Sequence, residues 1–160
     1  MFRKIKNWWL RVLWGLAGAD KELLDVAAFH HKFGVPINTS VTEISNELLR
    51  DRVNFILEEF SELIEDAGLQ LTYDIDTLEV HPHNPKDLPG IADALIDLVY
   101  VIKGTALILG LPWEELWDDV HRANMQKVRY EDETGHKFGI GKPDGWQPPQ
   151  TVRILMKDGW

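Results

Sequence analysis

Two long stretches of the chain place apolar residues at the spacing of a helix. Between residues 53 and 67 the apolar positions follow an i, i+3, i+4, i+7 series for four turns: Val53, Ile56, Leu57, Phe60, Leu63, Ile64 and Ala67. This series predicts an amphipathic helix. Between residues 91 and 109 nearly every position is aliphatic or small. A helix that is apolar almost all round is normally buried, so we expect this one inside the fold.

The same patterning predicts a single all-α domain, a helical bundle, over residues 1–160. We expect helices near 3–17, 20–32, 41–67, 88–109 and 113–128, with Pro112 suited to the first turn of the last one. The first of them is an extra N-terminal helix within residues 1–19. Residues 68–89 are expected to form an irregular loop, and an apolar-polar alternation from Leu69 to Ile75 predicts one short strand or hairpin arm. Glycine and proline turn signals argue against long regular elements in the C-terminal tail, 131–160.

Two carboxylates interrupt the second apolar stretch. At 100° per residue, Asp93 and Asp97 fall on one narrow stripe of the helix together with Tyr100 and Gly104. Carboxylates on a buried helix are costly to ionise unless cations or hydrogen-bond donors meet them. We therefore expect a positive partner at this stripe, and a divalent metal ion is our interpretation.

The helix predicted over residues 41–67 has an acidic face, which contains Glu58, Glu59, Glu62, Glu65 and Asp66. Glu59 and Glu62 are i, i+3 neighbours, and Glu58 and Glu62 are i, i+4 neighbours, so such pairs could share one metal ion. The simpler interpretation is a solvated acidic face. The second acidic stripe changes the balance, because two facing carboxylate groups repel each other without cations. Oxygen donors without cysteine favour Mg²⁺ or Mn²⁺ over zinc.

Several motifs of the chain resemble those of the MazG/HisE-like all-α nucleoside triphosphate pyrophosphohydrolases. They are Glu58-Glu59-Phe60-Ser61-Glu62, residues 92–100, residues 104–110 and residues 120–127, with Phe29, His30 and Arg52 fitting the early helices. The likeness runs from about Asp25 to Lys127 and is strongest to the phosphoribosyl-ATP pyrophosphohydrolase-like proteins of phages and bacteria. The second motif of the family is Glu-x-x-Asp, and here Ala94 stands where glutamate is expected. Asp93 would serve instead, since i, i+4 and i, i+3 residues face the same way.

The resemblance implies an activity and a set of residues. The reaction is cleavage between the α and β phosphates, giving a nucleoside monophosphate and pyrophosphate with two or three Mg²⁺ or Mn²⁺ ions per site. The implied metal ligands are Glu59, Glu62, Asp93 and Asp97, and Glu58 or Glu59 would take a proton from the attacking water. The implied substrate-binding residues are Arg52, Tyr100, Asn124 and Lys127. Relatives act on canonical, oxidised or uracil nucleotides or on phosphoribosyl-ATP, and some phage versions act on dGTP, so dGTP and GTP belong among the expected substrates. We expect a homodimer or homotetramer in the cytoplasm, or in the host cytoplasm if the chain is phage-encoded.

Composition and charge remove several other classes of protein. The chain has 160 residues, a formal net charge of −9 and no cysteine. The negative charge argues against a nucleic-acid-binding surface, and the absence of cysteine excludes disulfides and zinc fingers. An anionic triphosphate would need metal ions to approach such a protein. Residues 91–111 are long enough to cross a bilayer, but Asp93, Asp97 and Lys103 within them disfavour it.

An alternative function remains open from the sequence. The acidic faces could be solvated, and the basic, tryptophan-rich N-terminus could bind a membrane surface or a protein partner. The chain would then be a non-catalytic helical binding protein. A di-iron carboxylate bundle is disfavoured, because no Glu-x-x-His pair lies on the predicted helices. His81 and His83 lie in the expected loop without companion ligands, so we do not assign them to a metal.

Overall fold

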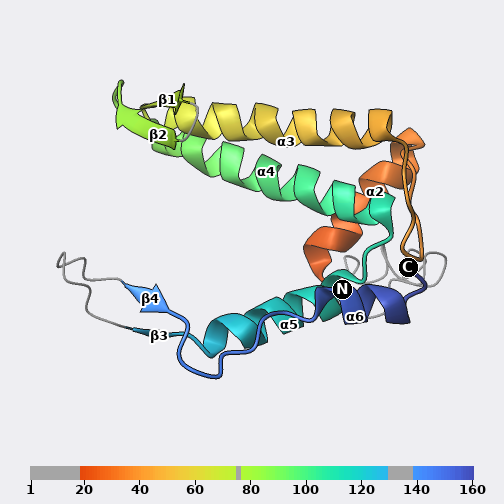
Figure 1. Ribbon diagram of the computed structural model, residues 1–160. Coiled ribbons are helices and arrows are strands. Elements are labelled where there is room, and N and C mark those ends of the chain that lie inside the picture. Colours follow the sequence, from red (N-terminus) through yellow and green to blue (C-terminus); the bar gives the residue numbers. More distant parts are fainter. Residues whose placement is uncertain (1–18, 75–76, 130–138) are drawn as a thin grey trace, which may run out of the picture.

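The computed structural model describes residues 19–74, 77–129 and 139–160 (Figure 1). Its helices are α2 (Lys21–Phe33), α3 (Asn46–Asp66), α4 (Leu88–Leu109), α5 (Trp113–Met125) and α6 (Thr151–Lys157). The strands are β1 (Leu69–Asp74), β2 (Thr77–Pro82), β3 (Val128–Arg129) and β4 (Ile140–Gly141). They form two separate antiparallel pairs, β1 with β2 and β3 with β4. The all-α fold class is confirmed. The helix predicted over 3–17 lies outside the described residues.

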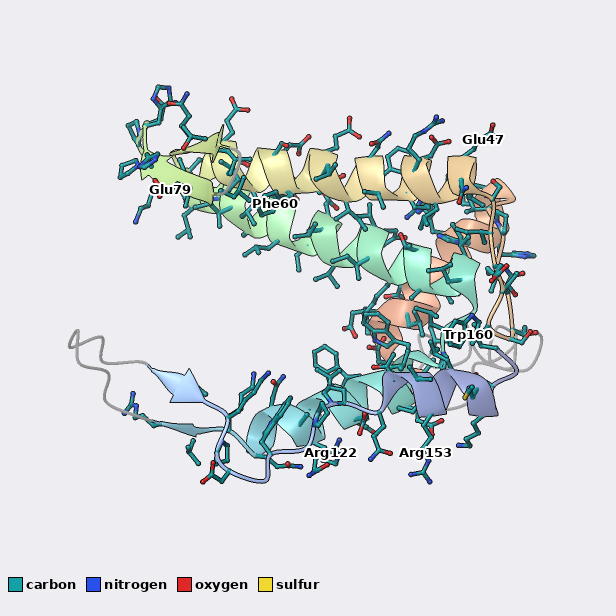
Figure 2. The ribbon with its side chains drawn as sticks, viewed as in Figure 1. Glu47, Phe60, Glu79, Arg122, Arg153 and Trp160 are labelled. Carbon is teal, nitrogen blue, oxygen red and sulfur yellow. The ribbon has the colours of Figure 1, made fainter. Side chains whose placement is uncertain are left out.

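Helices α3 and α4 run antiparallel along each other, and the β1–β2 hairpin joins them at one end (Figure 1). Figure 2 shows Phe60 between these two helices. At the other end α2 packs across α4. The main buried cluster lies where α2 meets the last turns of α4, and it consists of Ala19, Leu23, Leu24, Val26, Ala27, Ile37 and Leu107. Helix α5 turns away from α4 by 119° and packs against α6.

The helix boundaries agree with the predictions in two cases and differ in two. Helix α4 spans the predicted 88–109, and α2 is shifted by one residue from the predicted 20–32. Helix α3 begins at residue 46 rather than 41, because the hydroxyl of Ser45 accepts the N–H of Leu48 and caps the helix. The N–H of Thr42 instead donates to the carbonyl of Leu109 at 2.9 Å. Helix α5 ends at Met125 rather than at residue 128, which belongs to β3.

The loop and tail contain more regular structure than predicted. The predicted hairpin arm is real: β1 and β2 pair with Leu71 opposite Val80. The apolar-polar alternation carried that prediction for the first strand. The tail contains the helix α6, which the glycine and proline signals around it concealed. Among the described residues no single helix is long and apolar enough to span a bilayer, and only α4 and α5 together, despite their bend, meet that test of length and composition.

The expected burial of α4 is wrong for its first half. Ile96 is 66% exposed, Leu95 and Val99 are also exposed, and so are both aspartates. Helix α3 has no fully buried residue. The physical reason is that, among the described helices, α2 contacts the second half of α4, at Tyr100 and Lys103, and α3 covers the first half. The buried residues of α4 are Ala94, Lys103, Gly104, Ala106, Leu107 and Ile108.

Candidate active site

Five carboxylates gather where α3 packs against the open half of α4. Glu58, Glu59 and Glu62 come from the fourth and fifth turns of α3, and Asp93 and Asp97 come from the second and third turns of α4. Glu59 is half-buried, and the other four are exposed. Antiparallel packing of two helices whose acidic positions fall at i, i+3 and i, i+4 brings residues distant in sequence to one place.

Glu59 lies at the electrostatic centre of this group. Its pKa is raised, first by partial burial and then by the negative charges of Glu62, Asp97, Glu58 and Asp93, in that order. Each of the four neighbours therefore lies close enough to disfavour the charged form of Glu59. This is the evidence that the structure brings together the carboxylates of both predicted motifs.

The carboxylates do not converge into a closed ligand cage. Among the described residues no three histidine, aspartate or glutamate side chains come together in an arrangement that could hold a metal ion. Like charges at an exposed site separate from one another. The donor chemistry nevertheless fits Mg²⁺ or Mn²⁺, because all five side chains offer carboxylate oxygens and Glu59 is already disfavoured as an uncompensated anion.

Next to the two aspartates, the stripe of α4 reaches Tyr100, which packs against α2. Tyr100, Phe29 and Phe33 form an aromatic group there. The rings of Tyr100 and Phe29 meet edge to face with their centroids 5.6 Å apart. The ring centroids of Phe29 and Phe33 are 4.6 Å apart. Both phenylalanines are exposed although they come from a packed helix. The pKa of the Tyr100 hydroxyl is raised by burial and by the nearby charge of Asp25. The sequence reasoning had not assigned Phe33 to the site, although its i, i+4 spacing from Phe29 was a usable signal.

Arg52 lies apart from the carboxylate group. Its guanidinium donates to the carbonyl of Val101 at 2.9 Å and to the hydroxyl of Thr105 at 3.2 Å, so it joins α3 to α4. Burial lowers its pKa. Gly104 makes room for this contact: a Cβ there would lie 3.0 Å from the Arg52 guanidinium and 2.9 Å from Nε2 of His30. These contacts of Arg52 thus lie at the Gly104 end of the stripe, where it joins the two helices.

Asn124 and Lys127 are placed at the far end of α5. The N–H of Lys127 donates to the carbonyl of Asn124 at 3.1 Å, which closes the last turn. The indole N–H of Trp146 donates to the neighbouring carbonyl of Ala123 at 2.7 Å, so the tail is fixed to the same end. Within the described ranges, no hydrogen bond or ion pair links either side chain to the carboxylates.

The fold is all-α, and five carboxylates of α3 and α4 lie within electrostatic reach of one another. The family model described as phosphoribosyl-ATP pyrophosphohydrolase matches residues 26–124. That segment is more than half of the chain and contains every carboxylate of the site. The chain belongs to the phosphoribosyl-ATP pyrophosphohydrolase family, and membership implies a nucleotide pyrophosphohydrolase. A comparison with curated proteins finds no match.

Proposed function

We propose that the protein hydrolyses nucleoside triphosphates, deoxynucleotides included, between the α and β phosphates with the help of Mg²⁺ or Mn²⁺. The observation that carries this proposal is the gathering of five carboxylates from the packed helices α3 and α4, whose charges raise the pKa of Glu59. A concentration of negative charge with oxygen donors needs cations, and a triphosphate brings further negative charge that the same cations would offset. The family membership supports the reaction class.

We assign each group of residues a separate role in this reaction. Glu59, Glu62, Asp93 and Asp97 would hold two or three metal ions, which supply an acidified water and a clamp for the phosphates. Glu58 is exposed next to the group and would take the proton from the attacking water. Asn124 and Lys127 would contact phosphate oxygens, the lysine as a point charge. Arg52 would support the site through its contacts with α4.

The aromatic group beside the acidic stripe is our candidate for the base contact. Tyr100 leads along α4 from the carboxylates to Phe29 and Phe33, whose rings are exposed. Aromatic rings stack on bases of any kind, so this group favours a nucleotide substrate without selecting one. Purines offer the larger stacking surface, and we place dGTP and GTP first among the substrates to be tested.

We also propose a homodimer or homotetramer. The exposed large apolar side chains of α3 and α4 are Leu49, Val53, Phe55, Leu57, Leu88, Leu95, Ile96 and Val99. On α4, Leu95 follows Leu88 by seven residues and Val99 follows Leu95 by four, which places these three on one stripe with Ile96 beside it. Exposed apolar surface of this kind marks an interface, and a second copy offers the same stripe. The nucleotide substrate and the cysteine-free sequence both fit a cytoplasmic location, which we propose as well.

The experiment that tests the activity is a panel of nucleotides with Mg²⁺ or Mn²⁺, with products separated by anion exchange. The panel contains the ribo- and deoxynucleoside triphosphates and phosphoribosyl-ATP. We expect a monophosphate and pyrophosphate, and the order of the rates identifies the base. Diphosphate and phosphate would overturn the proposed site of cleavage. Absence of turnover with every compound would overturn the enzymatic function.

The exposed apolar side chains also suit a second candidate, a non-catalytic helical binding protein. The two functions differ in their response to ligands. An enzyme with a metal-nucleotide site is stabilised by Mn²⁺ plus a non-hydrolysable nucleotide, because a ligand that binds the folded state raises the melting temperature. The binding-protein function predicts no shift in melting temperature under the same conditions.

A further inference from the structure

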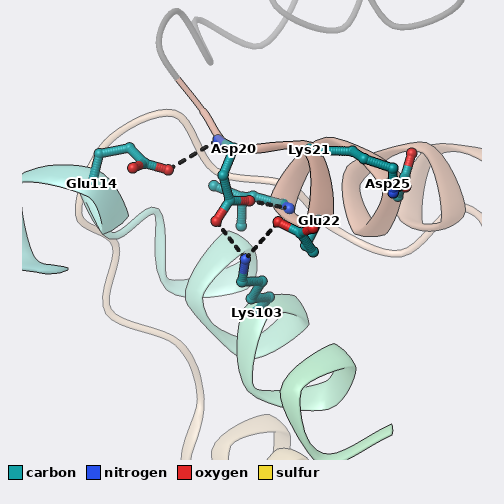
Figure 3. A network of polar contacts seen from close by, with 7 residues as sticks. Asp20, Lys21, Glu22, Asp25, Lys103 and Glu114 are labelled. Carbon is teal, nitrogen blue, oxygen red and sulfur yellow. Dashed lines mark hydrogen bonds and ion pairs between the residues drawn. The ribbon is translucent and has the colours of Figure 1, made fainter. Parts of the chain in front are cut away.

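A charged side chain lies inside the protein, away from the carboxylate group. Lys103 of α4 has a side chain only 8% exposed. Its ammonium lies 2.5 Å from Oδ2 of Asp20 and 3.8 Å from Oε2 of Glu22, both at the start of α2 (Figure 3). A buried ammonium is unfavourable unless it is paired, so these carboxylates hold Lys103 in place.

Asp20 also contacts the first turn of α5. Its backbone N–H donates to Oε1 of Glu114 at 3.0 Å, while its Oδ1 accepts the N–H of Leu23 at 2.6 Å and caps α2. Asp20 therefore connects three helices at once: α2 through the cap, α4 through Lys103 and α5 through Glu114 (Figure 3). Trp113 completes this junction, since it packs against the buried cluster and its ring lies 5.9 Å from the Lys103 ammonium.

After this junction, α5 contacts α6 and the residues just before it. Lys157 of α6 pairs with Glu115 at 3.0 Å, and Asp119 accepts the N–H of Gln150. A cavity of about 470 Å³ is lined by Leu155 and Trp160 on one side and by the loop before α3 and the end of α4 on the other. Figure 2 shows Trp160 on the side of α6 that faces the bundle. The chain connection at Gly110 (φ 62°) requires glycine, because a Cβ there would clash with the carbonyl oxygen of Ser40.

We propose that Lys103 is a positioning residue: through Asp20 and Glu114 it sets the direction of α5, and with it the place of Asn124 and Lys127. The proposal rests on the proposed function for the consequence in catalysis. From Glu114 to Asn124 the helix rises about 15 Å, so a tilt of about 10° at the first turn moves Asn124 by about 2.6 Å. A displacement of this size is enough to break a hydrogen bond to a phosphate oxygen, because such bonds need donor–acceptor distances of about 2.7–3.2 Å.

The simpler role for such a buried pair is stability alone. The two roles differ in what a variant changes. Loss of stability lowers the folded fraction, which lowers the apparent kcat and leaves KM unchanged. Loss of position weakens the contacts of Asn124 and Lys127 with the phosphates, which raises KM in the fully folded enzyme.

The structural half of the test measures a distance between α3 and α5. The chain has no cysteine, so Ser61→Cys on α3 and Asp118→Cys on α5 carry the only two spin labels, and dilution with unlabelled protein removes distances between copies. We expect one narrow distance distribution in this background. Lys103→Met and Glu114→Ala should broaden or shift it. The matched control is Glu115→Ala, which removes the same charge from the same turn but breaks a contact with α6.

The kinetic half uses the preferred nucleotide of the panel, below the melting temperature of each variant. We expect KM to rise about tenfold or more in Lys103→Met and Glu114→Ala and to stay constant in Glu115→Ala. Glu114→Ala leaves the Lys103–Asp20 pair intact, so the test survives if Lys103→Met does not fold. Unchanged distances in Glu114→Ala, or an unchanged KM beside a reduced kcat, would overturn the proposal. Altered distances in a protein that turns over no nucleotide would support the junction and count against the proposed function.

Discussion

The two halves of helix α4 have opposite surroundings although their sequences are almost equally apolar. From Lys103 to Ile108 the helix is packed under α2, and Leu107 is 3% exposed. From Leu88 to Val99 the described helix that covers it is α3, and most of its large side chains are exposed. The carboxylates lie in the open half. Stability is thus concentrated at one end of the helix, while the chemistry and the surface for association lie at the other.

The stripe of α4 that carries the aspartates shows the same division. Asp93 and Asp97 are exposed, whereas Tyr100 and Gly104, next on the same stripe, lie against Phe29 and His30 of α2. Helix α2 crosses α4 here, since Asp20 at its start contacts Lys103 and His30 near its end lies against Gly104. The place where α2 crosses α4 therefore decides where the buried stripe ends and where the open site begins.

The largest effect should come from the open half, in activity. Asp97→Asn or Glu62→Gln removes one negative ligand, and we expect kcat/KM to fall by about a hundredfold, which is roughly 3 kcal/mol. Steady-state rates on the preferred nucleotide measure this. Glu65→Gln, an exposed residue of the same helix, is the control and should retain its activity. Full activity in either ligand variant would contradict the assignment of the site.

The packed half should dominate stability. Leu107→Ala leaves a cavity in the buried cluster, and we expect a loss of about 3 kcal/mol in the free energy of unfolding. Leu88→Ala is the matched control, the same change on the same helix at a residue that is 73% exposed. It should change the free energy by no more than about 0.5 kcal/mol. Urea unfolding measures both values, and similar losses would remove the distinction between the two halves.

Much of the fold was readable from the sequence because it depends on local periodicity. The apolar series gave α4 its ends and α3 its extent from Ser45 onwards, and the alternation after Leu69 indicated the hairpin. The cap at Ser45 was missed because residues 41–45 contain apolar positions that continue the helical series by chance. Helix α6 was missed because seven residues give too short a pattern for a periodicity to emerge.

The sequence predicts which acidic residues share a face of each helix, but it does not predict how exposed they are. The i, i+3 and i, i+4 spacing of the carboxylates is a property of each helix alone, so the two acidic groups could be named. How far α2 covers α4 is a tertiary property, and the apolar composition of α4 wrongly suggested that the aspartates are buried. The Lys103 junction was also hidden, because it joins residues 83 positions apart.

The next effect concerns association through the open half. Ile96→Ser places a hydroxyl on the exposed apolar stripe of α4, and we expect a smaller particle mass at a given concentration in light scattering. The uncharged replacement leaves the electrostatics of the neighbouring Asp97 unaltered. Val152→Ser on α6 is the control, because Val152 is similarly exposed but lies outside the stripe. A monomeric wild-type protein would contradict the proposed assembly.

The smallest effect should come from His30, in the packed half. Its pKa is lowered by burial first, and the positive charge of Arg52 adds to this, while the hydrogen bond of Nδ1 with the carbonyl of Pro36 opposes it. The folded state therefore keeps the imidazole neutral at pH values where the unfolded state has taken up a proton. Above a pH of about 6.5 both states are neutral and the residue contributes nothing. Below that value stability falls, by at most about 1.4 kcal/mol per pH unit, until the folded state is protonated too.

Glu59 has the opposite effect on how stability depends on pH. The variant must therefore change the contribution of His30 and leave that of Glu59. Because the pKa of Glu59 is raised, the folded state binds a proton more readily than the unfolded state, so this carboxyl favours folding as the pH falls. His30→Asn removes the titrating group and keeps an amide that can donate to Pro36, while Glu59 is unchanged. Urea midpoints at pH 7.5 and 5.5, in metal-free buffer, should show a larger drop for the wild type and for the exposed-residue control His31→Asn than for His30→Asn. Equal drops in all three proteins would place the pH dependence elsewhere, and the open half would then be the region to examine.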